Sequence, residues 1–129
     1  MKKEIYTIAG GLVGKCNSYN LTISECSSEV DFYIGDATQR YIGGLFGFIA
    51  APGSFTNCHF DGCFMNESGE VIDSGTSLSL GAAIGEHYAR SSKEFCTFTN
   101  CSYYADKTGN IPKVKKPLEG QDYSGIIAK

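Results

Sequence analysis

The sequence has few prolines, little net charge and no long apolar run, and each shortage excludes a class of protein. Three prolines among 129 residues leave no proline-rich linker. The formal net charge of -3 argues against nucleic-acid binding, because phosphate recognition needs a clustered basic face. No apolar run approaches the roughly 18 residues of a membrane-spanning helix. With 42% hydrophobic and 19% charged residues, the composition is instead typical of one folded domain.

The N-terminus lacks the pattern of a secretory signal peptide. Met1-Lys2-Lys3 has the expected positive charge, but Glu4 and Tyr6 stand where an apolar segment should follow. If Met1 is the natural start, we expect a cytoplasmic protein; a cell-surface or secreted protein is the alternative. The six cysteines are then expected to be reduced thiols that pack as small apolar side chains. A secreted disulfide framework is the alternative.

What the chain does contain is a pair of phrases that recur in the same order. The first phrase is rich in glycine, and the second is an alternating stretch that ends in cysteine. The glycine phrase occupies residues 8–14, 41–47 and, in weaker form, 80–85, and the cysteine phrase occupies 22–26, 54–58 and 97–101. Phrases that recur at intervals of roughly 32 to 43 residues indicate a repeat architecture, in which equivalent segments stack on one another.

Three short strands per repeat predict an all-β fold, a parallel β-solenoid of about three repeats over residues 1–105. Residues 106–129 lie outside the repeat and are expected to form a C-terminal tail or cap. The segment that favours a short helix is 86–94. We expect one continuous strand in each glycine phrase, over residues 5–14, 42–49 and 78–85.

The recurring glycines and cysteines have expected structural roles. Glycines recur where the chain turns a corner or another backbone comes close, and the glycines concerned are Gly10, Gly11, Gly43, Gly44 and Gly81. The last cysteine of each cysteine phrase is expected to stack in the interior, which forms a row of buried reduced thiols from Cys26, Cys58 and Cys101. Strict alternation in the first repeat places Ile23 and Glu25 on one side of the strand and Cys26 on the other.

The two phrases also resemble a known family. Gly10-Gly11-Leu12-Val13-Gly14, followed by Thr22-Ile23-Ser24-x-Cys26, is similar to the GLUG repeat of bacterial surface proteins and adhesins. Asn57-Cys58 and Asn100-Cys101-Ser102-Tyr103-Tyr104 resemble the Asn-Cys-Tyr ending of that repeat. The resemblance covers about residues 5–105 and is weakest in the third repeat. It implies a β-solenoid and brings no catalytic residues with it.

Cysteine and histidine pairs invite metal or thiol chemistry. Cys58-His59-x3-Cys63 and Cys96-x4-Cys101 come near the spacing of structural zinc sites, although alternation in a strand would turn Cys58 and Cys63 to opposite faces. A cysteine nucleophile could use His59 or His87 as its base, but neither histidine stands in a recognisable motif. We therefore interpret the chain as having no catalytic residue, no metal site and no cofactor.

The remaining interpretation is a binding protein. Two segments, 66–77 and 86–93, exceed the repeat length, and extra residues on a regular scaffold often mark a contact surface. The candidate binding residues in them are Asn66, Glu67, Glu70, Asp73, Glu86, Tyr88 and Arg90. An open end of the stack also predicts pairing, either as a homodimer or with another protein.

The hypothesis for function is a non-catalytic protein-protein interaction module. In particular, we expect a small intracellular inhibitor, encoded by a phage or mobile element, that binds a bacterial host protein. A repeat fragment of a secreted adhesin is the alternative, and a thiol or zinc enzyme is a third.

Overall fold

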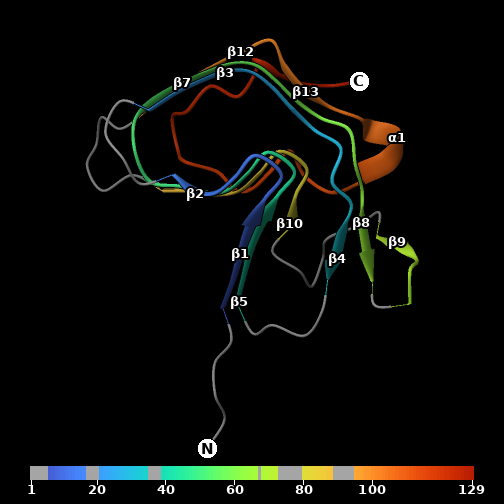
Figure 1. Cartoon of the computed structure of the whole chain (residues 1–129). Coiled ribbons are helices and arrows are strands. Elements are labelled where there is room, and N and C mark those ends of the chain that lie inside the picture. The colour runs from blue at the N-terminus through green and yellow to red at the C-terminus, as the bar shows by residue number, and fades with distance from the viewer. Residues whose placement is uncertain (1–5, 17–20, 35–38, 67, 73–79, 89–94) are drawn as a thin grey trace, which may run out of the picture.

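A computed structural model describes residues 6–16, 21–34, 39–66, 68–72, 80–88 and 95–129. Within these ranges the chain forms short strands and one short helix, α1 (Ala105–Thr108), as Figure 1 shows. The strands are β1 (Tyr6–Gly10), β2 (Val13–Cys16), β3 (Leu21–Ser28), β4 (Phe32–Ile34), β5 (Gln39–Gly43), β6 (Phe46–Ile49), β7 (Gly53–Phe60), β8 (Phe64–Asn66), β9 (Val71–Ile72), β10 (Leu80–Gly81), β11 (Ile84–His87), β12 (Cys96–Thr99), β13 (Cys101–Tyr103), β14 (Val114–Lys116) and β15 (Ile126–Ala128). The first repeat holds β1–β4, the second β5–β9 and the third β10–β13.

The strands form four sheets, and each sheet collects strands from different repeats. Sheet A has the order β1-β5-β10, and sheet B has the order β14-β11-β6-β2. In sheet C, β7 pairs with β3, β12 and β13, and β13 pairs with β15; sheet D has the order β4-β8-β9. Among the described strands, the pairing of β8 with β9 is antiparallel and the pairings between repeats are parallel. The all-β class with parallel sheets is confirmed, and Figure 1 shows successive repeats lying over one another.

The register of these sheets follows the sequence repeat. Because each strand pairs with the equivalent strand of the next repeat, equivalent residues lie side by side, and we call each such set a column. The glycine column runs through Gly10, Gly43 and Gly81. Apolar columns run through Val13, Phe46, Ile84 and Val114, and through Ile23, Phe55 and Phe98.

Each glycine phrase is broken by a corner, so the prediction of one continuous strand per phrase is wrong. The described part of each phrase bends at residues 11–12, 44–45 and 82–83, and the chain leaves sheet A for sheet B there. A Cβ atom at Gly43 would lie 2.1 Å from the carbonyl oxygen of Phe46 and 2.7 Å from the nitrogen of Gly85. The corner closes so tightly that the backbone on its far side occupies the space of a side chain.

A second departure from the expected alternation lies in sheet C. Glu25, Asn57 and Asn100 adopt the left-handed region, with φ of 57°, 53° and 53°. Each adds one outward residue, so the cysteine that follows turns back to the interior. Cys58 is fully buried, and Cys26, its partner in register, packs against the core as Ile23 does. The prediction that Cys26 faces away from Ile23 is therefore wrong, because the period of two is interrupted at Glu25.

The core lies between the sheets and is densest in the second repeat. Leu45, Phe46, Ile49, Phe60 and Phe64 are all fully buried. Their aromatic rings continue between repeats, since the ring centroids of Phe55 and Phe98 lie 5.3 Å apart in a stacked arrangement. Burial of these large side chains is the main driving force for stacking one repeat on the next.

The segment after the third repeat adds strands to the same sheets. β14 pairs in parallel with β11, and β15 pairs in parallel with β13. Val114 and Ile126 thereby join the buried core. The short helix α1 lies in this segment, whereas the predicted helix over 86–94 is not found where the structure can be described. Its first residues, Glu86 and His87, belong to β11, and residues 89–94 lie outside the described ranges.

Candidate functional site

The binding residues predicted from the sequence lie, where the structure describes them, at two different sheets. Asn66 closes the turn of the β8–β9 hairpin, where its Oδ1 accepts hydrogen bonds from the backbone nitrogens of Ser68 at 2.9 Å and Glu70 at 3.0 Å. Glu86 and Tyr88 lie in or directly after β11, which belongs to another sheet. The three further candidates lie outside the described residues, namely Glu67, Asp73 and Arg90.

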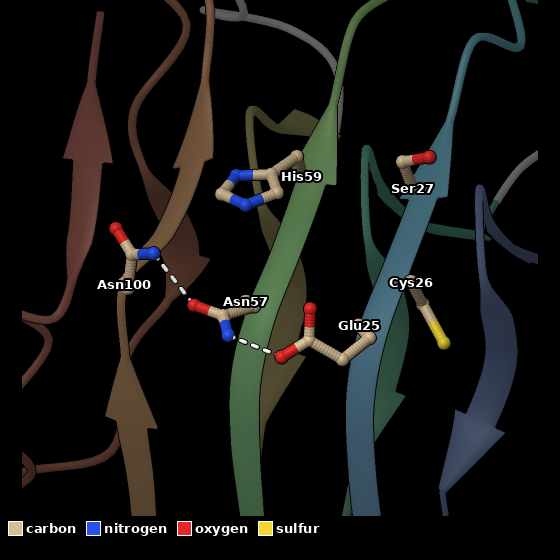
Figure 2. A pocket seen from close by; sticks show the side chains of 6 residues that line it. All are labelled: Glu25, Cys26, Ser27, Asn57, His59 and Asn100. Atoms are coloured by element: carbon tan, nitrogen blue, oxygen red, sulfur yellow. Dashed lines mark hydrogen bonds between the residues drawn. The ribbon is translucent and has the colours of Figure 1, made fainter.

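A pocket instead opens on the outer face of sheet C. Its volume is about 390 Å³, and Figure 2 shows side chains from neighbouring strands of successive repeats around it. The lining residues are Glu25, Cys26, Ser27, Asn57, His59 and Asn100. They come from β3, from β7 and from the junction of β12 with β13, so each of the three repeats contributes to the pocket.

A chain of side-chain hydrogen bonds crosses the pocket. Asn100 donates from Nδ2 to Oδ1 of Asn57 at 2.5 Å, and Asn57 donates from its own Nδ2 to the carboxylate of Glu25. Apart from glycines, these are the three residues in the described part of the chain whose φ is positive. Asparagine tolerates this left-handed conformation better than most residues, and glutamate does not favour it. The left-handed backbone places all three polar side chains on the outside of the sheet.

A second row lies one step further along the strands. Ser27 pairs in register with His59, and His59 pairs in register with Ser102. The Nδ1 atom of His59 lies 2.6 Å from Oγ of Ser102. This contact holds the imidazole ring against the sheet, with Nε2 left as the ring nitrogen that a bound molecule can contact.

The pocket therefore offers both hydrogen-bond donors and acceptors on a rigid parallel sheet. One carboxylate, two amides, one imidazole and one hydroxyl lie along it. The thiol of Cys26 is half-buried and donates to the carbonyl oxygen of Ser24 at 3.3 Å. Such a polar lining suits the recognition of polar groups on a partner more than the enclosure of an apolar ligand.

The sequence motif that resembles a zinc site does not converge. Cys58 faces the core, whereas His59, the next residue, lines the outer pocket. The Sγ atom of Cys63 donates to Oδ1 of Asp31 at 3.5 Å. Among the residues that the structure describes, no cluster of three or more histidine, cysteine, aspartate or glutamate side chains could hold a metal ion.

The structure does bring one cysteine and one histidine together, inside the protein. Nε2 of His87 lies 3.7 Å from Sγ of Cys96, and Nδ1 of His87 lies 2.8 Å from the hydroxyl of Tyr123. Burial lowers the pKa of His87 to about 4 and raises the pKa of Cys96 to about 11. Both groups are therefore neutral at pH 7, the opposite of the thiolate and imidazolium that an activated cysteine needs.

The cysteine column of sheet C, formed by Cys26, Cys58 and Cys101, packs into the protein interior and hydrogen-bonds backbone carbonyl groups. Cys58 and Cys101 are fully buried, while Cys26 in the first repeat is half-buried. The Sγ atom of Cys101 donates to the carbonyl oxygen of Phe55, in the preceding repeat, at 3.5 Å. A hydrogen bond with Cys101 and burial together raise the pKa of the Cys58 thiol well above its usual range. All six cysteines are free thiols.

Sequence reasoning missed the pocket residues although a signal for them was present. A polar residue precedes the cysteine in every cysteine phrase, as Glu25, Asn57 and Asn100.

Within the described residues, no helix is both long enough and apolar enough to cross a membrane. No protein-family model matches the sequence, and no curated protein or solved structure matches it either.

Proposed function

We propose that this chain is a non-catalytic protein-binding module built on a parallel β-solenoid, and that the polar pocket of sheet C is its contact site. The order in which the chain visits the sheets supports the solenoid. β1 to β4 lie in sheets A, B, C and D, and β5 to β8 lie in the same four sheets in the same order. A chain that returns to each sheet one repeat later describes a coil. The GLUG-like phrases at residues 8–14 and 22–26 agree with this architecture.

The observation that carries the binding function is the arrangement of Glu25, Asn57 and Asn100. Three successive repeats each hold a polar side chain on the outer face from a left-handed backbone position. Glutamate in that region costs on the order of 1–2 kcal/mol, and asparagine costs less. Backbone strain that recurs in successive repeats and presents a row of polar side chains beside an open pocket is characteristic of a binding surface.

The surrounding chemistry supports binding over catalysis. His59 is held by Ser102, and the cysteine nearest to His59 in the chain, Cys58, faces the core. The other histidine, His87, is buried and neutral beside Cys96. A solvated nucleophile with an adjacent base, which a thiol enzyme requires, is thus not formed by the described cysteine and histidine residues.

The partner predicted from the sequence is a bacterial host protein that the chain inhibits, and this stays a prediction. The rival, a fragment of a secreted adhesin, would use the same surface for a cell-surface partner. Both readings place a protein on the outer face of sheet C, so one structural experiment tests the contact site for either.

The experiment compares two exposed serines that carry a photo-crosslinking amino acid. Ser27 lines the pocket, and Ser124 is another exposed serine, in the C-terminal segment. A purified partner is expected to crosslink through position 27 and not through position 124, and the additional change His59→Ala should abolish the crosslink. Equal crosslinking at both positions, or crosslinking that His59→Ala leaves unchanged, would show that the contact site lies elsewhere.

A further inference from the structure

The first repeat of the stack is less buried than the second. In the first repeat, Leu12 and Ile23 are only partly buried, whereas their counterparts in the second repeat, Leu45 and Phe55, are at most 1% exposed. Cys26 is likewise half-buried while Cys58 is fully buried. The positions that the next repeat covers elsewhere are therefore left partly uncovered at the start of the stack.

Both ends also present free strand edges, among the strands that the structure describes. β2 is the last strand of sheet B at one end, and β14 is the last strand at the other. In sheet C, β3 pairs only with β7, and β15 pairs only with β13. A free edge carries unpaired backbone donors and acceptors, and these can pair with another strand.

The existing register determines how a second copy would continue the sheets. Ala128 pairs with Tyr103, Tyr103 with Phe60, and Phe60 with Ser28, so these four residues share one column. A copy stacked in the same register would set Ala128 against Ser28 of its neighbour. In sheet B the same rule sets Val114 against Val13.

The charges at the two ends are complementary. The exposed acidic residues near the edge of the first repeat, outside the pocket, are Glu29 and Asp31. The opposite end carries the exposed lysines Lys116 and Lys129. In the continued register Lys129 follows Ala128 as Glu29 follows Ser28, so this lysine and this glutamate would meet across the junction.

One pair opposes the stacking. Lys116 shares a column with Glu86, Phe48 and Lys15, so the continued register sets Lys116 against Lys15 of the next copy. Like charges directly opposite one another on a sheet are destabilising. The wild-type contact is therefore weakened at this position, and this makes the register testable.

On these grounds we propose that the chain assembles head to tail with further copies of itself, β14 and β15 of one copy pairing in parallel with β2 and β3 of the next. This inference rests on the β-solenoid of the proposed function. It uses the ends of the stack and not the outer face of sheet C. Because the two contacting surfaces differ, the contact is heterologous and generates open assemblies when it does not close into a ring.

The test is sedimentation velocity of the full chain over a wide range of protein concentrations. The wild type is expected to change reversibly from a 13.9 kDa monomer to a series of larger species as the concentration rises. Lys116→Glu replaces a repulsive pair with an attractive one and should lower the concentration needed for assembly by roughly threefold to fivefold. Lys15→Glu should do the same, because it changes the other member of the same pair.

The double variant, Lys15→Glu with Lys116→Glu, restores a like-charge pair and should return assembly to the wild-type concentration or above it. Glu29→Lys should weaken assembly, since it places two lysines together. The melting temperature of each variant is the control for folding. A small decrease is expected, because Lys116→Glu faces Glu86 of its own chain and Lys15→Glu loses the contact between the ammonium group and the Phe48 ring. The assembly concentrations are therefore compared at a temperature where every variant is folded.

Two results would overturn the proposal. One is a monomer at every concentration in both the wild type and Lys116→Glu. The other is a closed dimer whose stability is not raised by Lys15→Glu or Lys116→Glu and is not returned to the wild-type value by the double variant. Either result leaves the pocket of sheet C untouched as a partner site, because crosslinking through Ser27 is measured at concentrations where the chain is monomeric.

Discussion

Asn100 hydrogen-bonds Asn57 across two successive repeats, with 2.5 Å between Nδ2 of the first and Oδ1 of the second. Asn57 in turn donates a hydrogen bond to the carboxylate of Glu25 in the preceding repeat. Asn57 is thus both donor and acceptor at the centre of the row, and it adopts the left-handed backbone. Asn57 therefore contributes to the stability of the fold in two ways, through its side-chain hydrogen bonds and through its tolerance of positive φ.

These contributions can be separated by two substitutions at Asn57. Asn57→Ala removes the side-chain hydrogen bonds and also strains the backbone, so the free energy of unfolding should fall by about 2–3 kcal/mol. Asn57→Gly removes the same hydrogen bonds but accepts φ of 53° without strain, so the loss should be about 1 kcal/mol. Urea unfolding measures both values. An equal loss in the two variants would mean that the backbone conformation contributes nothing.

The glycine corner makes a prediction about volume. A Cβ atom at Gly44 would lie 2.2 Å from Cδ2 of Phe60 and 2.3 Å from the carbonyl oxygen of Ala82. Gly44→Val should therefore destabilise the fold by several kcal/mol, on the order of 3 or more, because a backbone atom cannot yield. Gly14→Ala is the matched control, since its Cβ would meet nothing nearer than the Ile8 oxygen at 3.5 Å. If Gly44→Val and Gly14→Ala lowered the melting temperature equally, the close approach of the backbone would not explain the Gly-Gly pair.

His87 predicts how stability depends on pH. Burial lowers its pKa from 6.5 to about 4, and its side chain is 3% exposed. Between those two values the unfolded chain binds a proton that the folded chain does not, so unfolding becomes easier as pH falls. The contribution is fully present above pH 6.5 and should decline by on the order of 3 kcal/mol on approach to pH 4.

The matched variant for this pH dependence is His87→Gln, which keeps a polar side chain but has no ionisation in the range. Its free energy of unfolding should decline less steeply than that of the wild type between pH 6.5 and pH 4. Chemical denaturation at a series of pH values gives the two slopes. Parallel slopes would assign the acid sensitivity to other groups.

Thiol labelling of the native protein should divide the six cysteines into two classes. Cys26 and Cys63 are half-buried and should react first with an aromatic disulfide reagent. The buried thiols should react slower by at least about tenfold, because they must wait for local opening, and they are Cys16, Cys58, Cys96 and Cys101. Peptide mapping of the labelled sites over time measures the rates. Uniform fast labelling of all six would be incompatible with the stacked interior.

Much of the fold could be predicted because the spacing of the sequence repeat also determines which residues pair in the sheets. Parallel strands from successive repeats pair residue for residue, so the recurrence of Gly10 at Gly43 and Gly81 already names one column. The interior position of Phe46 and Ile84 follows from the same recurrence. Local spacing determines these features, and no distant contact is needed to predict them.

The candidate site could not be predicted in the same way. Alternation assumes an unbroken period of two, and Glu25, Asn57 and Asn100 break it through a backbone conformation that composition does not reveal. The sequence predicts binding residues on the segments of extra length, 66–77 and 86–93. In the described part of the first of these, Asn66 closes a turn.

The amino-acid sequence alone determined that this protein is all-β with parallel sheets, since a repeated pattern of short alternating strands has to bury the same face in every repeat. Only the tertiary structure decided which side chains meet. The sheet places Asn57 between Glu25 and Asn100, and the fold brings Tyr123 from the C-terminal segment onto His87. Such contacts join residues far apart in the chain, and they arise from packing of whole repeats rather than from any local preference.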